Sequence, residues 1–395
     1  MEQDVQDYVE DLEQVVSLLR ASFVGKDELV ELMATAAVAQ EHLLIVGPPG
    51  TAKSALIKQF AQYCSAGEEY FEYLLTRFTE PNEIFGAVDI SAFRDGVGME
   101  RKTQGMLPQA QIAFLDEVFK ANSAILNALL SILNERKFYN GHLRDDVPLI
   151  SAIGATNNVP DETELAALYD RFLIRFWTDN VEETRFPELF QRGWELEQER
   201  IAAGYGVEAG TIMTTGGLRR LYQEVGRVDM SAIMRPYREV IRRIRAQGIR
   251  LSDRRVVKML KLIAASAIRN KRMQANPGDF WVLRHVWNNA EQIPHLQTIV
   301  DPYVVAFEGE TWRAERSLDN IEGELAVLLE RAKQLRTDVD IADFLQQAEG
   351  VRRELMRHSA GGKDSPANMQ QKHAALSARV KQQVTETMDL LEKML

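Results

Sequence analysis

The sequence predicts an α/β fold: a parallel-sheet domain over residues 1–181, an all-helical domain over 182–301 and a C-terminal helical hairpin over 302–395. Three observations support this prediction. Short apolar runs alternate with helical patterns as far as Trp177, which is typical of a doubly wound parallel sheet. From about Glu182 the strand-like runs disappear and only helical patterns remain. Beyond Pro302, apolar residues recur at three–four spacing, as in a heptad seam.

Composition limits the class of protein. The chain has 395 residues, of which 47 are Lys or Arg and 58 are Asp or Glu, and its net charge of −11 argues against dedicated nucleic-acid binding. Cys64 is the only cysteine, so no intramolecular disulfide can form, which is typical of a reducing compartment. The N-terminus lacks a signal-peptide pattern, and no apolar run is long enough to span a bilayer. We therefore expect a soluble cytoplasmic protein without a membrane span.

The chain begins with two amphipathic helical patterns. The first covers Val5–Phe23, and the second runs from about Glu28 to Gln40. Val24-Gly25-Lys26-Asp27 breaks the pattern between them. The apolar run His42–Val46 follows and predicts a buried strand.

A glycine-rich loop connects this strand to a helical pattern: Gly47-Pro48-Pro49-Gly50-Thr51-Ala52-Lys53-Ser54. Strand, tight loop and helix form the context that a phosphate-binding loop (P-loop) requires, and an ordinary Gly-Pro turn is the alternative. Backbone N–H groups and the positive end of the helix dipole would suit a polyphosphate. Lys53 would reach the β- and γ-phosphates, and the Ser54 hydroxyl would ligate Mg²⁺. Ala52 stands where the strict pattern has Gly, which restricts this position to φ < 0 unless strain is accepted.

A second strand is predicted at Tyr70–Leu75. The following stretch, Arg77–Leu107, is rich in turn residues. We expect a short helix near Pro81–Phe85 and a hairpin around Asp95-Gly96 within it.

The apolar strand that starts at Gln111 ends in two acids, Asp116 and Glu117. Because ligands bind beyond the carboxyl ends of the strands in a parallel sheet, both acids should lie beside the P-loop. Asp116 would hold the water shell of Mg²⁺. Glu117 would orient or deprotonate the attacking water. The alternative is a strand that happens to end in an acidic turn.

Further elements complete the sheet domain. The strand Leu149–Ala155 leads to Asn157, whose amide would hold the lytic water or contact the γ-phosphate; a helix-capping Asn is the alternative. The other expected elements are the helix Ala121–Glu135, a hairpin with an Asn-Gly signal over Phe138–Leu143, the helix Glu164–Tyr169 and the strand Leu173–Trp177.

The helical domain has a basic middle. Helices are expected at Glu183–Ala203, Gly217–Val225, Ser231–Gln247, Asp253–Lys271 and Pro277–Asn289. A solvated surface is the simplest interpretation of the basic side chains; an anionic nucleotide across an interface and nucleic acid are the alternatives. These side chains are Arg235, Arg238, Arg242, Arg243, Arg245, Arg250, Arg254, Arg255, Lys258 and Lys261.

The last residues predict a long antiparallel helical hairpin. Its second helix should begin near Ser365-Pro366, because Ser is a common N-cap and Pro suits the first turn. The hairpin could be an arm for a partner, or a helical pair packed on the body or on a neighbour.

These segments together resemble the MoxR family of AAA+ ATPases, and within it the RavA-like group. The resemblance covers most of the chain, from about Phe23 to about Ile299, and MoxR-type loops often carry Ala before the Lys. Beside the P-loop, it is carried by Val24-Gly25-Lys26-Asp27-Glu28-Leu29, Phe114-Leu115-Asp116-Glu117, Ile125-Leu126-Asn127-Ala128-Leu129-Leu130, Asn134-Glu135-Arg136, Ala155-Thr156-Asn157, Leu168-Tyr169-Asp170-Arg171-Phe172-Leu173-Ile174-Arg175 and Ser252-Asp253-Arg254-Arg255.

The resemblance implies residue roles at the nucleotide. Val24-Gly25 would lie against adenine, and Asn157 would be the sensor-1 residue. Arg171 would act as an arginine finger on ATP held by the neighbouring subunit, with Arg175 as the alternative. Such a finger is worth roughly 10³–10⁵ in rate in related phosphoryl-transfer systems.

The resemblance also implies roles outside the P-loop. Arg254 would be the sensor-2 arginine of a lid that begins near Glu182, with Arg255 as the alternative. Arg77–Leu107 would be the insert that this clade carries near the ring pore. The chain departs from the RavA-like pattern after about Val300, where a helical hairpin replaces that group's small β-rich domain.

The resemblance implies an ATPase that forms a homo-oligomeric ring, most often a hexamer, and that remodels a protein client. Family members commonly work with a von Willebrand factor A-domain (vWA) protein. Two other functions use the same core: a nucleic-acid motor, which the basic stretch would favour, and an ATP-bound scaffold that does not hydrolyse. Glu117 argues against the scaffold, because an inactive site need not keep the base.

Overall fold

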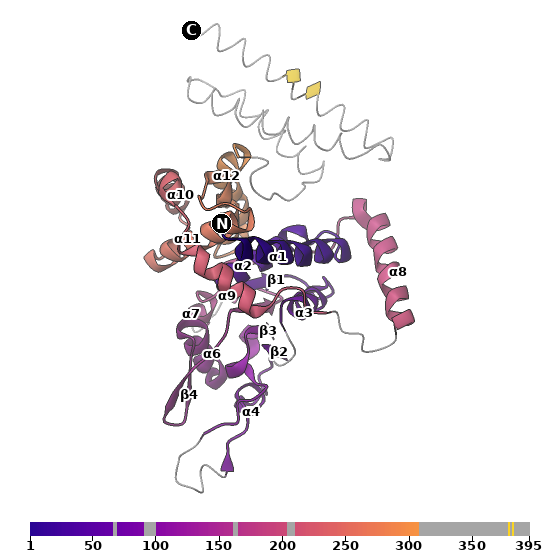
Figure 1. The fold of residues 1–395 in the computed structure, drawn as a ribbon, viewed down its shortest axis with the longest axis vertical. Coiled ribbons are helices and arrows are strands. Elements are labelled where there is room, and N and C mark those ends of the chain that lie inside the picture. The colour runs from indigo at the N-terminus through magenta and orange to yellow at the C-terminus, as the bar shows by residue number, and fades with distance from the viewer. Residues whose placement is uncertain are drawn as a thin grey trace. The chain divides into compact units, whose positions relative to one another are not determined.

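The computed structural model describes residues 1–65, 69–90, 100–160, 165–203, 210–307, 378–379 and 381–382 (Figure 1). Met1–Val300 belong to one compact unit. The expected hairpin around Asp95-Gly96 lies outside the described residues, as does almost all of the expected C-terminal helical hairpin. Both therefore stay predictions.

Five parallel strands form one sheet: β1 (Leu43–Val46), β2 (Tyr70–Leu74), β3 (Ile112–Asp116), β6 (Ser151–Thr156) and β7 (Ile174–Trp177). Their order is β2-β3-β6-β1-β7. Leu43 of β1 is opposite Ile153 on one side and Ile174 on the other. Every residue of β1 is buried, which explains why a central parallel strand reads as an unbroken apolar run.

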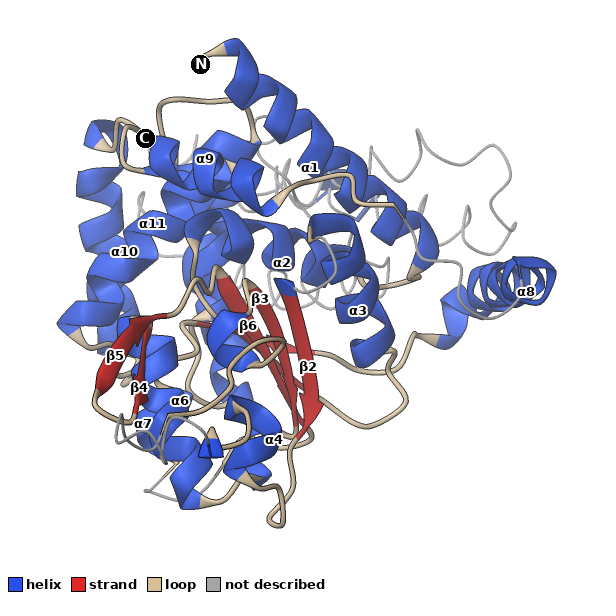
Figure 2. Ribbon diagram, turned by 60° about the horizontal axis from the view of Figure 1, so that its bottom comes forward, coloured by secondary structure: helices blue, strands red, loops and turns tan. Residues whose placement is uncertain are grey.

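Helices lie on both faces of this sheet (Figure 2). The helices of the sheet domain are α1 (Gln3–Ser22), α2 (Asp27–Ala39), α3 (Lys53–Cys64), α4 (Pro81–Phe85), α6 (Ser123–Glu135) and α7 (Ala166–Tyr169). Their bounds agree with the expected helices to within a few residues, and the alternation of strands and helices confirms the α/β fold class. Across the described ranges, no helix is long and apolar enough to cross a membrane.

The antiparallel strands β4 (Lys137–Asn140) and β5 (Leu143–Asp146) form the predicted hairpin. Gly141 has φ +63°, the left-handed backbone that a two-residue hairpin turn requires. The predicted hairpin is therefore confirmed, although its two-residue loop is Gly141-His142 and Asn140 is the last residue of β4.

The described residues after β7 are helical, as predicted. Their α-helices are α8 (Phe186–Ala203), α9 (Thr215–Val225), α10 (Met234–Ala246), α11 (Asp253–Arg269) and α12 (Ile293–Val305). Short 3₁₀ helices precede or separate them: η4 (Glu183–Arg185), η5 (Ser231–Ile233), η6 (Pro277–His285) and η7 (Ala290–Gln292).

One helix prediction in this part was wrong, and one helix was missed. Pro277–His285 form a 3₁₀ helix and not the α-helix expected as far as Asn289. Its residues from Gly278 to His285 are all buried. The sequence therefore lacks the alternation of buried and exposed positions that would reveal the type of helix. The helix α12 was not predicted; it continues through Pro302, although proline usually marks a helix boundary.

A buried ion pair joins the helical region to α2. Arg269 of α11 approaches Glu31 of α2 at 2.7 Å, and their side chains are 5% and 2% exposed. Arg269 also donates to the Thr35 hydroxyl at 3.0 Å and to the Glu13 carboxylate at 2.7 Å. Burial of these charges is tolerable because each has close partners of opposite charge.

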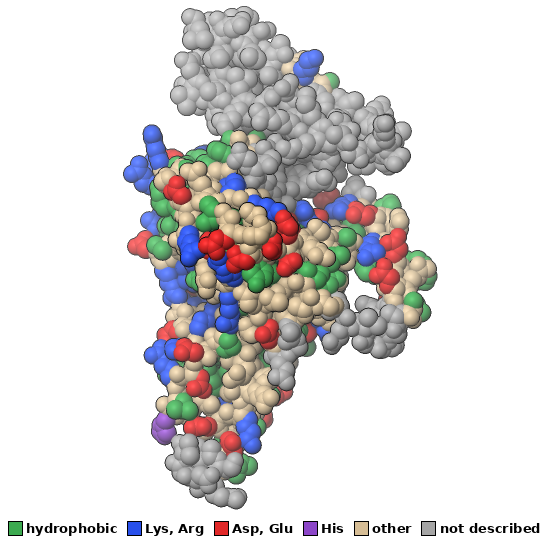
Figure 3. All heavy atoms as spheres, viewed as in Figure 1, with side chains coloured by type: hydrophobic (Ala, Val, Ile, Leu, Met, Phe, Trp, Pro, Cys, Tyr) green, Lys and Arg blue, Asp and Glu red, His purple; other side chains and the backbone are tan. Residues whose placement is uncertain are grey.

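The basic side chains of the helical region fall into two groups: some are buried or paired with a buried acid, and others are exposed on α10. In the first, Lys258 and Lys261 pair with the buried Glu41, and Arg255 is buried. Figure 3 shows Lys and Arg side chains gathering at the left of the view, where α10 and α11 lie in Figure 1. The exposed arginines of α10 are Arg235, Arg238, Arg242, Arg243 and Arg245. Part of the stretch thus serves internal packing, which weakens the nucleic-acid alternative.

Candidate active site

The P-loop begins at a position that only glycine can occupy. Gly47 donates its N–H to the Thr156 carbonyl of β6 at 3.1 Å. A Cβ atom at Gly47 would lie 2.0 Å from the backbone oxygen of Thr178. The loop is therefore clamped between the carboxyl ends of β6 and β7, where a parallel sheet places its ligand.

Ala52 has a left-handed backbone, which is strained for a residue other than glycine. It has φ +61° and ψ +19° and is the N-cap residue of α3. The position thus keeps the left-handed backbone for which the strict pattern uses Gly. The left-handed conformation costs a non-glycine residue about 1–2 kcal/mol, which marks the loop as a shape maintained by its surroundings.

Lys53 lies inside the loop. Its side-chain amine donates to the carbonyls of Gly47 at 2.8 Å and Pro48 at 2.7 Å. Burial lowers the pKa of Lys53, while Asp116 and Glu117 act in the opposite direction. The ammonium group thus bonds to the loop and is close enough to both acids to feel their charge, and phosphate oxygens could replace its carbonyl partners.

Lys26 is a second lysine near the loop, and its position was not predicted. Its amine donates to the Thr178 hydroxyl and to the Asp179 carbonyl, both at 2.7 Å. Burial lowers the pKa of Lys26 to about 8, with Asp179 raising it and Lys53 lowering it further. The only sequence signal was its place in the Val24–Leu29 segment.

The two acids end β3 as expected. Asp116 accepts a hydrogen bond from the backbone N–H of Glu117 at 2.9 Å. Glu117 has φ +49° and ψ +44°, a left-handed conformation that is uncommon outside glycine. Its carboxylate accepts from the Asn157 amide at 2.6 Å and lies 3.2 Å from the Lys120 amine. Asn157 thus holds the candidate base, and it is not a helix cap.

The donor set fits a magnesium nucleotide. Ser54 is exposed at the first turn of α3, and Asp116 is half-buried at the end of β3. A hydroxyl and a carboxylate are hard oxygen donors, which Mg²⁺ prefers. Thr51 supports the loop by donating to the Pro48 carbonyl at 3.1 Å.

The segment expected beside adenine lies next to the P-loop side of the sheet. Val24 is buried, and Gly25 has φ +72°. The Lys26 bonds to Thr178 and Asp179 tie this segment to the end of β7, one strand from the P-loop.

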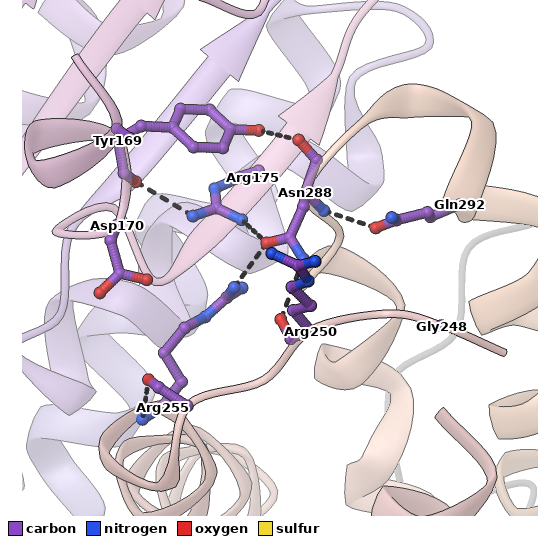
Figure 4. A pocket seen from close by; sticks show the side chains of 10 residues that line it. Tyr169, Asp170, Arg175, Gly248, Arg250, Arg255, Asn288 and Gln292 are labelled. Atoms are coloured by element: carbon purple, nitrogen blue, oxygen red, sulfur yellow. Dashed lines mark hydrogen bonds between the residues drawn. The ribbon is translucent and has the colours of Figure 1, made fainter. Parts of the chain in front are cut away.

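The two candidate finger arginines have different environments. Arg171 is partly exposed, and its guanidinium lies 3.7 Å from the Asp170 carboxylate. Arg175 is 1% exposed. It donates to the Tyr169 carbonyl and to the Asn288 side chain (Figure 4), and also to the Trp287 carbonyl. Burial lowers the pKa of Arg175 to about 9. Only Arg171 could reach a neighbouring chain without rearrangement of the core.

The two candidate sensor-2 arginines lie at the start of α11, and the contacts of neither include the P-loop of the same chain. Arg254 is exposed and donates to the side chain of Asn134 near the end of α6. Arg255 is 3% exposed and donates to the Val286 carbonyl at 2.7 Å and to Asn288 at 2.6 Å. In this structure Arg254 thus bonds to the sheet domain and Arg255 to the lid.

Two family descriptions match the chain. Residues 10–215 match the MoxR domain of the MoxR–vWA–β-propeller ternary systems. Residues 231–300 match an AAA lid domain, which corresponds to the region from η5 to α12. The RavA-like subgroup stays a prediction.

Several known proteins resemble the chain. Two uncharacterised proteins of Methanocaldococcus jannaschii are each 38% identical to it, over 80% of this chain and 81% of the first, and over 79% of this chain and 77% of the second. The chaperone MoxR1 of Mycobacterium tuberculosis is 29% identical over 54% of both chains.

A solved structure shows the same fold. The crystal structure of a putative ATPase from Cytophaga hutchinsonii has a TM-score of 0.60 and 17% identity, and the match covers 76% of this chain and 96% of that one. The family descriptions, the parallel sheet and the P-loop geometry agree. The chain belongs to the MoxR family of AAA+ ATPases.

Proposed function

We propose that the chain hydrolyses ATP at the interfaces of a ring of its own copies, a hexamer, and uses the reaction to remodel a protein client. The observation that carries this proposal is the hydrogen bond of 2.6 Å between Asn157 and Glu117. It holds a carboxylate at the end of β3, next to the lysine of the P-loop. A general base is useful only when its position is fixed.

The residues of one chain would bind and activate the substrate. The P-loop and Lys53 would bind the phosphates, with Ser54 and Asp116 holding Mg²⁺, which neutralises phosphate charge. Glu117 would take a proton from the attacking water while Asn157 keeps its carboxylate in place. The Val24-Gly25 segment would lie against adenine.

An arginine of the next chain would complete the site. Arg171 is partly exposed beyond the end of α7, where a neighbour could meet it. Its guanidinium would stabilise negative charge that develops on the transferred phosphoryl group. Arg254 at the start of α11 would act as the sensor-2 residue of the lid.

The partner proposal rests on the relatives. The matching description is of a MoxR domain that works in MoxR–vWA systems, and one relative is named a chaperone. We propose a vWA protein as the partner and a protein as the client. No nucleic-acid role is proposed, because the chain is acidic and part of its basic stretch is paired internally.

The test compares the wild-type chain with Glu117→Gln. ATP hydrolysis, ATP binding and particle mass with and without ATP would be measured for both. The proposal expects the variant to bind ATP and to form the same assembly while turnover falls by at least about 10²-fold. Equal turnover by the two proteins would contradict the assigned base.

A further inference from the structure

A cavity of about 470 Å³, lined mostly by polar and charged residues, lies where the lid meets the end of α7 (Figure 4). One side comes from the sheet domain and the other from the segments before and after α11. The cavity is lined by Ala166, Tyr169, Asp170, Arg175, Gly248, Arg250, Ser252, Arg255, Asn288 and Gln292. Asn288 contacts both sides.

Asn288 binds the sheet-domain side through two groups. Its backbone carbonyl accepts a hydrogen bond from the Tyr169 hydroxyl at 2.8 Å. Its side-chain oxygen accepts from the Arg175 guanidinium at 3.0 Å. Tyr169 ends α7 and Arg175 lies in β7, so both bonds reach the same corner of the sheet domain.

Asn288 binds the lid side through its remaining groups. The same side-chain oxygen accepts from Arg255 of α11 at 2.6 Å. The side-chain amide donates to the Arg250 carbonyl at 2.9 Å, and the backbone N–H donates to Gln292 at 2.8 Å. All four polar groups of this residue are therefore used.

The two residues that bond to Asn288 from this corner, Tyr169 and Arg175, lie on either side of Arg171 in the sequence. Tyr169 precedes it by two residues and Arg175 follows it by four. Arg175 also donates to the Tyr169 carbonyl at 3.0 Å, and its guanidinium lies 3.9 Å from the centre of the Tyr169 ring. The turn that carries Arg171 is thus closed on itself and attached to Asn288 at both ends.

The attachment depends on the Asn288 side-chain oxygen, because two buried arginines donate to it. Arg175 and Arg255 are both nearly fully buried, and one amide oxygen accepts from both. As a like charge, Arg255 lowers the pKa of Arg175, whereas Asp170 raises the pKa of both arginines. A shared acceptor between two buried cations keeps them at a set separation.

We infer that Asn288 is a positioning residue that couples the lid to Arg171 of the same chain. Movement of α11 would shift the oxygen shared with Arg255, and the corner that carries Arg171 would follow. Through Arg171, the lid of one chain would then act on the ATP of the next. This inference rests on the proposed function, since it requires Arg171 to act on a neighbour.

Mixing experiments test the inference. An interface in which the ATP-holding chain keeps Glu117 and its neighbour keeps Arg171 is active. In an equimolar mixture of the two variants, such an interface forms when an Arg171→Ala chain holds ATP and a Glu117→Gln chain supplies the arginine. Because the contact is head-to-tail, this happens at about one interface in four of a randomly assembled ring. Their mixture should regain about a quarter of the wild-type rate at saturating ATP.

Asn288→Ala should behave like Arg171→Ala in these mixtures. Alone it should lower kcat at least about tenfold with KM for ATP little changed, as expected when transition-state stabilisation is lost. With Glu117→Gln it should regain activity, and with Arg171→Ala it should not. The reverse pattern would place its effect on its own ATP site and overturn the inference. An unchanged kcat for Asn288→Ala would overturn it as well.

Two further variants separate positioning from folding. Asn288→Asp keeps an oxygen for both arginines and should restore most of the rate. Tyr169→Phe removes only the hydroxyl bond and should lower kcat with the fold intact, so it carries the test if Asn288→Ala does not fold. A normal rate for Tyr169→Phe and no rescue by Asn288→Asp would contradict positioning. Failure of the Glu117→Gln and Arg171→Ala mixture would instead overturn the proposed function, and the inference with it.

Discussion

The Asn157 amide donates a hydrogen bond of 2.6 Å to the Glu117 carboxylate. The two residues follow neighbouring strands, β6 and β3, so the order of the sheet brings them together. Glu117 also has a left-handed backbone, which turns its side chain at the end of its strand. An amide held against a general base fixes the direction in which that base accepts a proton.

Removal of the Asn157 amide should therefore slow hydrolysis without abolishing it. We expect Asn157→Ala to lower kcat by about 10–10²-fold, less than Glu117→Gln, because the base remains but is no longer held. ATP affinity should change little. Asn158→Ala is the matched control, since its side chain is exposed; a loss of kcat as large in the control would show that the effect is not due to the Glu117 contact.

Relief of backbone strain at Ala52 should stabilise the protein. Gly avoids the cost of about 1–2 kcal/mol for a left-handed residue, but it loses about 0.4–1 kcal/mol through unfolded-state entropy. Ala52→Gly should thus raise the free energy of unfolding by about 0.5 kcal/mol, as measured with urea. Ala52→Val, which is branched at Cβ, should lower it. The opposite order of the two variants would mean that this position is not left-handed in solution.

Lys26 should make stability depend on pH. The folded-state pKa of Lys26 is about 8, below its ordinary value of 10.5, so the unfolded chain binds more protons between these values. Stability must then rise with pH across that window. Relative to Lys26→Met, the wild type should gain about 1 kcal/mol in unfolding free energy from pH 7 to pH 9. A pH-independent difference between the two proteins would contradict the lowered pKa.

The buried ion pair between α11 and α2 should matter more than exposed pairs. Arg269→Met leaves Glu31 buried without its closest cation and should cost about 3–5 kcal/mol of unfolding free energy. Arg242→Met removes an exposed arginine that pairs with Glu239 and should cost less than about 1 kcal/mol. Adding Glu31→Gln to Arg269→Met should recover part of the loss. Equal costs for the two single variants in urea unfolding would refute this ranking.

Much of the fold could be predicted because its signals are local. The apolar run before Gly47, the Asn-Gly turn at Gly141 and the Pro at the start of α4 each specify an element through their neighbours. The grouping of Glu117 with Lys53 also follows from a rule, since parallel strands end at one edge of the sheet.

Other features depend on contacts between distant segments. Asn288 lies more than a hundred residues from Tyr169 and Arg175, and nothing near it in sequence marks it as a hub. Lys26 has its pKa lowered by the fold around it, which composition does not reveal. The 3₁₀ helix η6 is buried throughout, so the pattern that distinguishes helix types was missing.

The most direct test of the account is the specific rate of ATP hydrolysis as a function of protein concentration, for the wild type and Arg171→Ala. Arg238→Ala, an exposed lid arginine, serves as the control. We predict that the wild-type and control rates rise as rings form, while Arg171→Ala still binds ATP but loses at least about 10³-fold in turnover. A rate that is independent of concentration and unchanged by Arg171→Ala would contradict a site shared between chains.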